Sequence, residues 1–276
     1  MQYTFFTRAA VTDSMASPRA AQPALFSRRL SRVPDGVPRL DHLLARNLPA
    51  SRSTARSVIE AGGVSGADGQ PLLDPRQDIS ADQLPLPVAV EGKPLALHDE
   101  VYLLLHKPVG YVTALRDDRH PVAAALVKHA PLAGELRPVG RLDLDTSGLL
   151  LWTTSGPWLQ QLTHPKRAVP RRYQAALARP YQPPAPDLVL DDGHRPVILD
   201  LQPLPPDRRH PALLSPAETT TWAQITLAGG AYHEVRRIFA ALGSHVLGLC
   251  RVGFGRLALP LDLAPGAFAL IGRDDV

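Results

Sequence analysis

The stretch that decides the fold lies near the middle of the chain and joins a polar turn to an apolar run. Residues 140–154 read Gly-Arg-Leu-Asp-Leu-Asp-Thr-Ser-Gly-Leu-Leu-Leu-Trp-Thr-Thr. The apolar half has the length of a buried strand, so Asp143 stands at the rim of a buried element. Packing holds such a carboxylate rigidly, and a neighbouring cation such as Arg141 can tune it. A nucleophile or general base needs this setting.

Length, composition and cysteine content limit the class of protein. The chain has 276 residues, of which 45% are hydrophobic, enough for a small module plus one globular domain of about 180–200 residues. Cys250 is the only cysteine, so no intramolecular disulfide can form, which predicts a reducing compartment. No apolar run approaches the roughly 20 residues that cross a bilayer, and the N-terminus lacks the order of a secretory signal. We therefore expect a soluble, cytoplasmic protein without membrane contact.

The charges are segregated along the sequence. Residues 1–60 carry nine arginines against four acidic residues, whereas residues 61–100 carry two basic residues against seven acidic ones. The formal net charge of the whole chain is +4, with a pI near 9.4. Because Lys and Arg that neutralise phosphates dominate nucleic-acid affinity, the basic end predicts a polyanionic partner. A solvated basic face without a partner is the alternative.

Sequence patterns divide the chain into four segments. Residues 1–37 show no sustained periodicity and predict a flexible basic extension. Residues 38–91 predict a small module and residues 92–100 a linker. Residues 101–276 predict a second domain, which begins with a short, continuously apolar run.

Two short helices open the predicted module. Leucines recur at helical spacing at positions 40, 43, 44 and 48. A second helix is expected over residues 53–61, with Ser51 or Ser53 as its N-cap. Arg52 and Arg56 are four residues apart and share one face of that helix. The pair Asp68-Gly69 then predicts a hairpin turn.

Strands outnumber helices in the predicted second domain. Buried strands are expected at residues 101–105, 149–153, 173–178, 222–227 and 250–259, and helices at 157–162 and 232–242. Because strands and helices do not alternate regularly, the fold class is α+β with a largely antiparallel sheet. Residues 179–221 are rich in proline and polar turn residues, and they form an excursion from the core to which the sequence assigns no role.

Four blocks of the second domain resemble the pseudouridine synthases, in the branch that modifies ribosomal RNA. Residues 140–151 match the signature Gly-Arg-Leu-Asp-x-x-Thr-x-Gly-Leu-Leu-Leu, and the other blocks follow the family order at residues 106–112, 171–173 and 232–243. Residues 262–266 resemble the tail of the synthase that acts on small-subunit (16S) ribosomal RNA. Residues 38–91 are similar to the alpha-L RNA-binding domain. The resemblance implies a catalytic domain with a mixed, mostly antiparallel sheet and a small N-terminal α/β module.

The resemblance also implies a reaction and the residues that perform it. The family converts uridine in RNA to pseudouridine by breaking the N-glycosidic bond and joining the ribose C1′ to C5 of the base, without a metal or organic cofactor. Asp143 matches the catalytic aspartate, Arg236 its basic partner, and Tyr173 the tyrosine that stacks on the target base. Arg141 matches the arginine that fills the space left by the flipped uridine. We expect Arg236 within salt-bridge range of Asp143, and Tyr173 in the same cleft.

Basic residues outside the catalytic set are candidate RNA contacts. In the module these are Arg39, Arg52 and Arg56. In the second domain they are Lys107, Lys166, Arg167, Arg171, Arg172, His233 and Arg237, for each of which a solvated surface or a packing role is the alternative. The expected partner is ribosomal RNA or a ribosomal assembly particle, bound by a monomer.

The chain departs from the family pattern at several positions that we expect to be RNA contacts. His106 stands where the family usually has Asn, and Glu234 where it usually has Gln. Gly229-Gly230-Ala231 replaces the usual Glu-Gly-Arg or Lys. These departures leave a large-subunit rRNA target open, and a non-catalytic ribosome-assembly protein is a further alternative. Metal-dependent hydrolysis by Asp143 and Asp145 fits poorly, because no His or Cys cluster supplies the remaining ligands.

Overall fold

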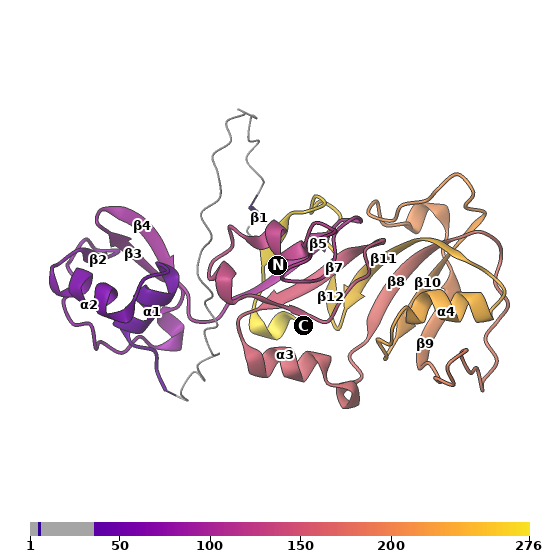
Figure 1. Ribbon diagram of the computed structural model, residues 1–276, viewed down its shortest axis with the longest axis horizontal. Coiled ribbons are helices and arrows are strands. Elements are labelled where there is room, and N and C mark those ends of the chain that lie inside the picture. Colours follow the sequence, from indigo (N-terminus) through magenta and orange to yellow (C-terminus); the bar gives the residue numbers. More distant parts are fainter. Residues whose placement is uncertain (1–4, 7–35) are drawn as a thin grey trace. The chain divides into compact units, whose positions relative to one another are not determined.

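The computed structural model describes residues 5–6 and 36–276, which form two compact units (Figure 1). The smaller unit ends at Asp99, and the larger comprises residues 100–276 together with Phe5 and Phe6. Most of the predicted flexible extension, residues 1–37, lies outside the described residues. Within the described residues, no helix has the length and apolar character needed to cross a membrane.

The smaller unit packs two helices against a three-stranded antiparallel sheet in the order β2-β3-β4. Its elements are α1 (Leu40–Asn47), α2 (Arg52–Glu60), β2 (Val64–Gly66), β3 (Leu86–Val90) and β4 (Lys93–Leu97). The expected leucine face of α1 is confirmed, because Leu40, Leu43 and Leu44 are fully buried. Of the two candidate caps, Ser51 is the N-cap of α2, and its hydroxyl accepts from the Thr54 N–H at 3.0 Å.

The linker predicted at residues 92–100 is wrong, since residues 93–97 form strand β4. Val90 pairs with Lys93 across a two-residue turn whose members, Glu91 and Gly92, both have positive φ. Such a turn joins antiparallel strands tightly. Leu97 is fully buried in the core of this unit, so alternating burial rather than composition decides that the segment is a strand.

Among the described residues of the larger unit, ten strands form one sheet whose main path is β1-β13-β5-β7-β11-β8-β10-β9. Their bounds are β1 (Phe5–Phe6), β5 (Tyr102–Lys107), β6 (Arg137–Val139), β7 (Thr146–Thr153), β8 (Arg171–Leu177), β9 (Ile198–Pro203), β10 (Thr221–Leu227), β11 (Val246–Phe254), β12 (Leu257–Ala258) and β13 (Phe268–Leu270). Only β7 and β11 pair in parallel, so the expected mostly antiparallel sheet is confirmed.

Helices cover both faces of this sheet. The helices are α3 (Gly156–Thr163) and α4 (Glu234–Ala241), and short 3-10 turns of the larger unit lie at Ala123–Val127, Ala133–Glu135, Pro165–Arg167, Pro206–Arg208 and Arg273–Asp275. A further 3-10 turn, Ala81–Gln83, belongs to the smaller unit. On β8, Ala176 packs in the cluster of α3, whereas Ala175 packs in the cluster of α4. Adjacent strand residues point to opposite faces, so α3 and α4 lie on opposite sides.

The continuous apolar run of the opening motif follows from this double coverage. In β7, Leu149 and Leu151 pack on the α3 side, while Leu150 and Trp152 pack against the 3-10 turn Ala123–Val127 on the other side. A strand covered on both faces is apolar at every position instead of alternating.

Gly148 in the same motif is required by the parallel pairing of β7 with β11. It pairs with Arg251 at a φ of +111°, and a Cβ added there would lie 2.3 Å from the Arg251 carbonyl oxygen. No side chain fits at that distance. The glycine therefore belongs to the scaffold that places the neighbouring Asp143.

Candidate active site

Asp143 lies on the loop between β6 and β7. Hydrogen bonds hold the main chain of this loop at the residues directly before and after Asp143. The Thr113 hydroxyl donates to the Leu142 carbonyl at 2.8 Å and accepts from the Leu142 N–H at 3.0 Å. The Gly110 N–H donates to the Leu144 carbonyl at 2.8 Å. The main chain is thus fixed before and after Asp143, while its side chain stays 33% exposed. A rigid, accessible carboxylate of this kind is suited to act on a bound substrate.

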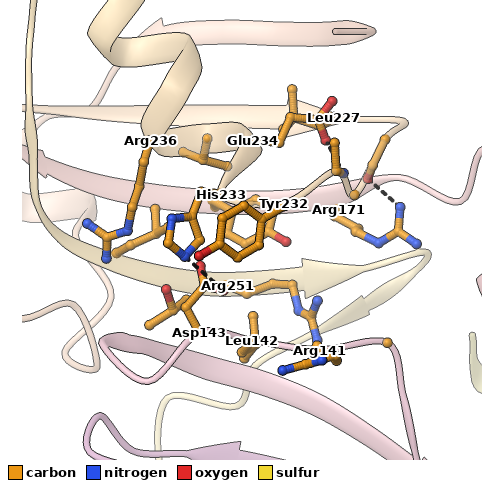
Figure 2. A pocket seen from close by; sticks show the side chains of 18 residues that line it. Arg141, Leu142, Asp143, Arg171, Leu227, Tyr232, His233, Glu234, Arg236 and Arg251 are labelled. Carbon is orange, nitrogen blue, oxygen red and sulfur yellow. Dashed lines mark hydrogen bonds and ion pairs between the residues drawn. The ribbon is translucent and has the colours of Figure 1, made fainter. Parts of the chain in front are cut away.

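A pocket of about 420 Å³ opens beside Asp143 (Figure 2). Its walls come from the loop at residues 140–143, from β8, from residues 229–236 and from β11. Arg141 and Tyr173 both line it, so the expectation that Tyr173 shares a cleft with Asp143 is confirmed. Four arginines and two carboxylates are among the lining residues, namely Arg141, Arg171, Arg236, Arg251, Asp143 and Glu234. The excess of positive charge suits a substrate that is an anion or that develops negative charge.

The ion pair expected between Arg236 and Asp143 is wrong. The Arg236 guanidinium instead lies 2.9 Å from the Asp145 carboxylate, and it donates to the Val246 carbonyl at 3.1 Å. His233 takes the expected place, with Nε2 3.6 Å from the Asp143 carboxylate. The reason lies in the start of α4: His233 is its N-cap and points at Asp143, whereas Arg236 sits one turn later and reaches the outer carboxylate.

Arg237 does not face the pocket as a free phosphate contact. Its guanidinium forms ion pairs with Asp191 and Asp192, and its Nε donates to Asp191 at 2.8 Å. These two carboxylates raise the pKa of Arg237. They also neutralise its charge, so the expected phosphate contact is not available in this arrangement.

Lys107 and His106, both expected at the RNA surface, are buried instead. The Lys107 ammonium donates to the carbonyls of Pro108 and Thr146 at 3.0 and 2.8 Å, and the side chain is fully buried. Burial lowers the pKa of Lys107 to about 8, although nearby Asp143 and Asp145 act in the opposite direction. His106 Nδ1 lies 2.7 Å from the Leu263 carbonyl. Both positions follow from a β5 strand that is covered on two faces.

The depressed pKa of Lys107 predicts how stability depends on pH. Between pH 8 and pH 10.5 the unfolded chain binds a proton at this lysine and the folded chain does not, because the folded pKa is about 8 and the unfolded pKa is 10.5. The folded state therefore gains stability as the pH rises through this range, and this gain is complete above pH 10.5 and is lost as the pH falls towards 8. The span corresponds to about 3 kcal/mol. The unfolding free energy of the wild type minus that of Lys107→Met, from urea titrations, should therefore rise between pH 8 and 10.5. A difference that stays flat would contradict the buried, depressed lysine.

The sequence did not single out Arg251 as a pocket residue. It lies in the apolar run of β11, is 1% exposed, and its Nε donates to the Leu149 carbonyl at 2.7 Å. Arg171, expected as a phosphate contact, donates to the Gly229 carbonyl, and burial lowers its pKa. An arginine inside an apolar run was the available signal, because a charge that must be buried needs a specific reason.

In the smaller unit, the three arginines expected to contact RNA converge on one carboxylate. Arg39, Arg52 and Arg56 lie 3.2, 3.0 and 3.1 Å from the fully buried Asp41. Burial by itself raises the pKa of Asp41, but the hydrogen bonds from Arg52 and Arg56 together with the charges of Arg52 and Arg39 outweigh burial, and the pKa is lowered. The three arginine side chains remain between 33% and 52% exposed. They hold the two helices together and still present positive charge to solvent.

Comparison with known proteins identifies the family of the chain. Residues 101–241 match the family model described as RNA pseudouridylate synthase. The chain is 33% identical over 239 residues to the ribosomal small subunit pseudouridine synthase A of Escherichia coli, which covers 86% of this chain and 98% of that protein. The protein of the same name from Pasteurella multocida is 32% identical over 243 residues, covering 86% and 97%. A crystal structure of a pseudouridylate synthase is 28% identical with a TM-score of 0.51, and covers 86% and 97%.

The fold and these relatives define an enzyme that acts on RNA. The chain belongs to the RNA pseudouridylate synthase family. Its described residues contain no group of three or more His, Cys, Asp or Glu side chains that could hold a metal ion.

Proposed function

We propose that the protein converts a specific uridine of small-subunit ribosomal RNA to pseudouridine. The proposal rests on one observation above the others: Asp143 of the family motif and Tyr173 line one pocket. It is supported by the 33% identity to a synthase named for the ribosomal small subunit, which extends over nearly the whole of that protein.

The reaction breaks the bond between the ribose C1′ and N1 of uracil, turns the base, and joins C1′ to C5, from which a proton leaves. Asp143 is proposed to act on the ribose, by attack or by proton transfer, since it is the carboxylate that the loop holds rigid and accessible. The departing uracil carries negative charge, which the surplus of arginines around the pocket stabilises. Tyr173, on the pocket wall, is proposed to stack on the base.

A uridine inside a stacked or paired RNA must be flipped out before a side chain can reach C1′, at a cost of a few kcal/mol. Arg141 lines the pocket and is itself exposed, so it can enter the space that the uridine leaves. His233 lies beside Asp143, with its Nε2 3.6 Å from the carboxylate. We propose these two residues as RNA contacts of the catalytic unit.

The module within residues 38–91, together with β4, is proposed to bind RNA through Arg39, Arg52 and Arg56. Three guanidiniums around one carboxylate keep a net positive charge of two, and their partly exposed N–H groups can contact phosphates.

We further infer a monomer acting in the cytoplasm, consistent with a single thiol that is buried.

Mapping pseudouridines in ribosomal RNA from cells that lack the gene tests the proposal. The expected result is the loss of one pseudouridine in 16S rRNA, restored by the wild-type gene and not by one encoding Asp143→Asn. Loss of a site only in 23S rRNA would move the target to the large subunit. An unchanged pattern in both RNAs would refute the proposed activity.

A further inference from the structure

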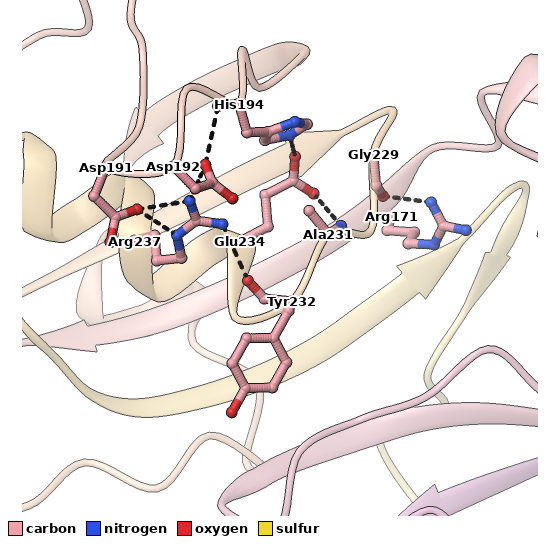
Figure 3. A network of polar contacts seen from close by, with 9 residues as sticks. All are labelled: Arg171, Asp191, Asp192, His194, Gly229, Ala231, Tyr232, Glu234 and Arg237. Atoms are coloured by element: carbon pink, nitrogen blue, oxygen red, sulfur yellow. Dashed lines mark hydrogen bonds and ion pairs between the residues drawn. The ribbon is translucent and has the colours of Figure 1, made fainter.

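The excursion between β8 and β10 makes specific contacts with the start of α4. At its tip, residues 191–194 form a tight turn, in which the Leu190 N–H donates to the His194 carbonyl and the Gly193 N–H to the Leu190 carbonyl, both at 2.9 Å. We name residues Asp191–His194 the brace turn. Its side chains point toward α4, as Figure 3 shows.

The first contact joins His194 of the brace turn to Glu234, the first residue of α4. His194 Nε2 lies 2.8 Å from one oxygen of the Glu234 carboxylate, whose side chain is only 3% exposed. The other oxygen accepts from the Ala231 N–H at 3.1 Å. Glu234 therefore links the brace turn to the loop at residues 229–233, which lines the pocket.

Gly229 makes room for this carboxylate. A Cβ at Gly229 would lie 2.6 Å and 2.7 Å from the two Glu234 oxygens, closer than a Cβ carbon can stand, so the carboxylate would have to leave its present place. Two positions at which the chain departs from the family pattern, Gly229 and Glu234, thus fit each other. The Gly229 carbonyl in turn accepts a hydrogen bond from Arg171.

The second contact joins the brace turn to Arg237, which lies three residues after Glu234 on α4. Arg237 forms ion pairs with Asp191 and Asp192, so the brace turn holds α4 at two points about one helical turn apart. The loop that these contacts secure carries Tyr232 and His233, whose rings stack at 3.8 Å with an interplanar angle of 17°.

His233 is the residue whose position matters for the site. It has a φ of +49°, which non-glycine residues adopt only where their surroundings impose it. In this conformation its Nε2 lies 3.6 Å from Asp143. Contacts that fix the loop therefore also fix the distance from His233 to the catalytic carboxylate.

We propose that the brace turn sets the position of His233 against Asp143, and that His194 and Glu234 are positioning residues of the active site. They act through the loop at residues 229–233 and not on the reacting atoms. This inference rests on the proposed role of Asp143 and adds a function to the excursion at residues 179–221.

The test uses the full chain with His194→Ala, Glu234→Ala and Glu234→Gln. Loss of the brace should lower kcat about tenfold while KM stays within about twofold, because a displacement of one ångström near reacting groups can cost even more. The glutamine variant should stay within about twofold of wild type, since its oxygen can accept from Ala231 and its amide can donate to His194. The imidazole NMR signals of His233, assigned with His233→Gln, should shift in both alanine variants.

Asp200→Ala is the matched control. Asp200 lies on β9 in the same excursion, is exposed, and contacts Gln202, so its loss should change neither kcat nor the His233 signals. If both alanine variants behave like Asp200→Ala, the brace is refuted. Should Glu234→Ala fail to fold, His194→Ala decides, because it removes a side chain that is 36% exposed. A wild type that is inactive would refute the proposed function, while the NMR comparison would still judge the brace.

Discussion

Asp143→Asn is expected to abolish uridine isomerisation while RNA affinity stays within a few-fold of wild type. Asparagine keeps the shape of the side chain but can neither attack the ribose nor accept its proton, so the loss falls on the transition state. The backbone contacts that hold the loop, from Thr113 and Gly110, do not involve the carboxylate. Folding should therefore be unchanged.

Release of tritium from RNA labelled at C5 of uridine measures this turnover, and filter binding measures affinity. Asp118→Asn is the control, because Asp118 is exposed and is not among the residues that line the pocket. Turnover of Asp143→Asn within tenfold of wild type would remove Asp143 from the catalytic role. A parallel loss of RNA affinity would indicate that the carboxylate organises binding instead.

Local patterns predicted much of the fold because they report burial directly. The leucines of α1 recur at the 3.6-residue period of a helix with one buried face, and the continuous apolar run of β7 marks a strand that is buried on both faces. Strand β9 and strand β4 were missed, since their faces are mostly exposed and their sequences resemble turns. Edge strands of this kind owe their structure to pairing with a neighbour, which a single sequence window does not contain.

The sequence predicted which residues form the site, but not which of their side chains form ion pairs with one another. The motif placed Asp143, Tyr173 and Arg236 in one pocket, and the structure brings them there. Which cation meets which carboxylate depends on the start of α4 and on the excursion that holds it, and these are tertiary contacts between distant segments. The excursion also occupies Arg237, and the coverage of β5 on both faces buries Lys107.

Arg236→Met is expected to lose most activity with little loss of stability. Its partner Asp145 is 66% exposed and water can solvate it once the arginine is gone, so the ion pair contributes no more than about 1 kcal/mol. If the partner carboxylate were buried, leaving it unpaired would lower the free energy of unfolding by about 3–5 kcal/mol. This larger value does not apply, because Asp145 is exposed. The guanidinium is nevertheless on the wall of the pocket, where removal of one preorganised cation typically lowers kcat by about 10²–10³-fold.

A double-mutant cycle separates the two roles that Arg236 can have. If the arginine serves the reacting RNA, Arg236→Met should lower kcat by about the same factor whether residue 145 is Asp or Asn. If it only orders Asp145, then Asp145→Asn alone should be as inactive as Arg236→Met, and the double variant no worse. Tritium release gives kcat for the four proteins, and thermal unfolding should place Arg236→Met within a few degrees of wild type. Equal, non-additive losses in both single variants would transfer the role to the Arg236–Asp145 pair.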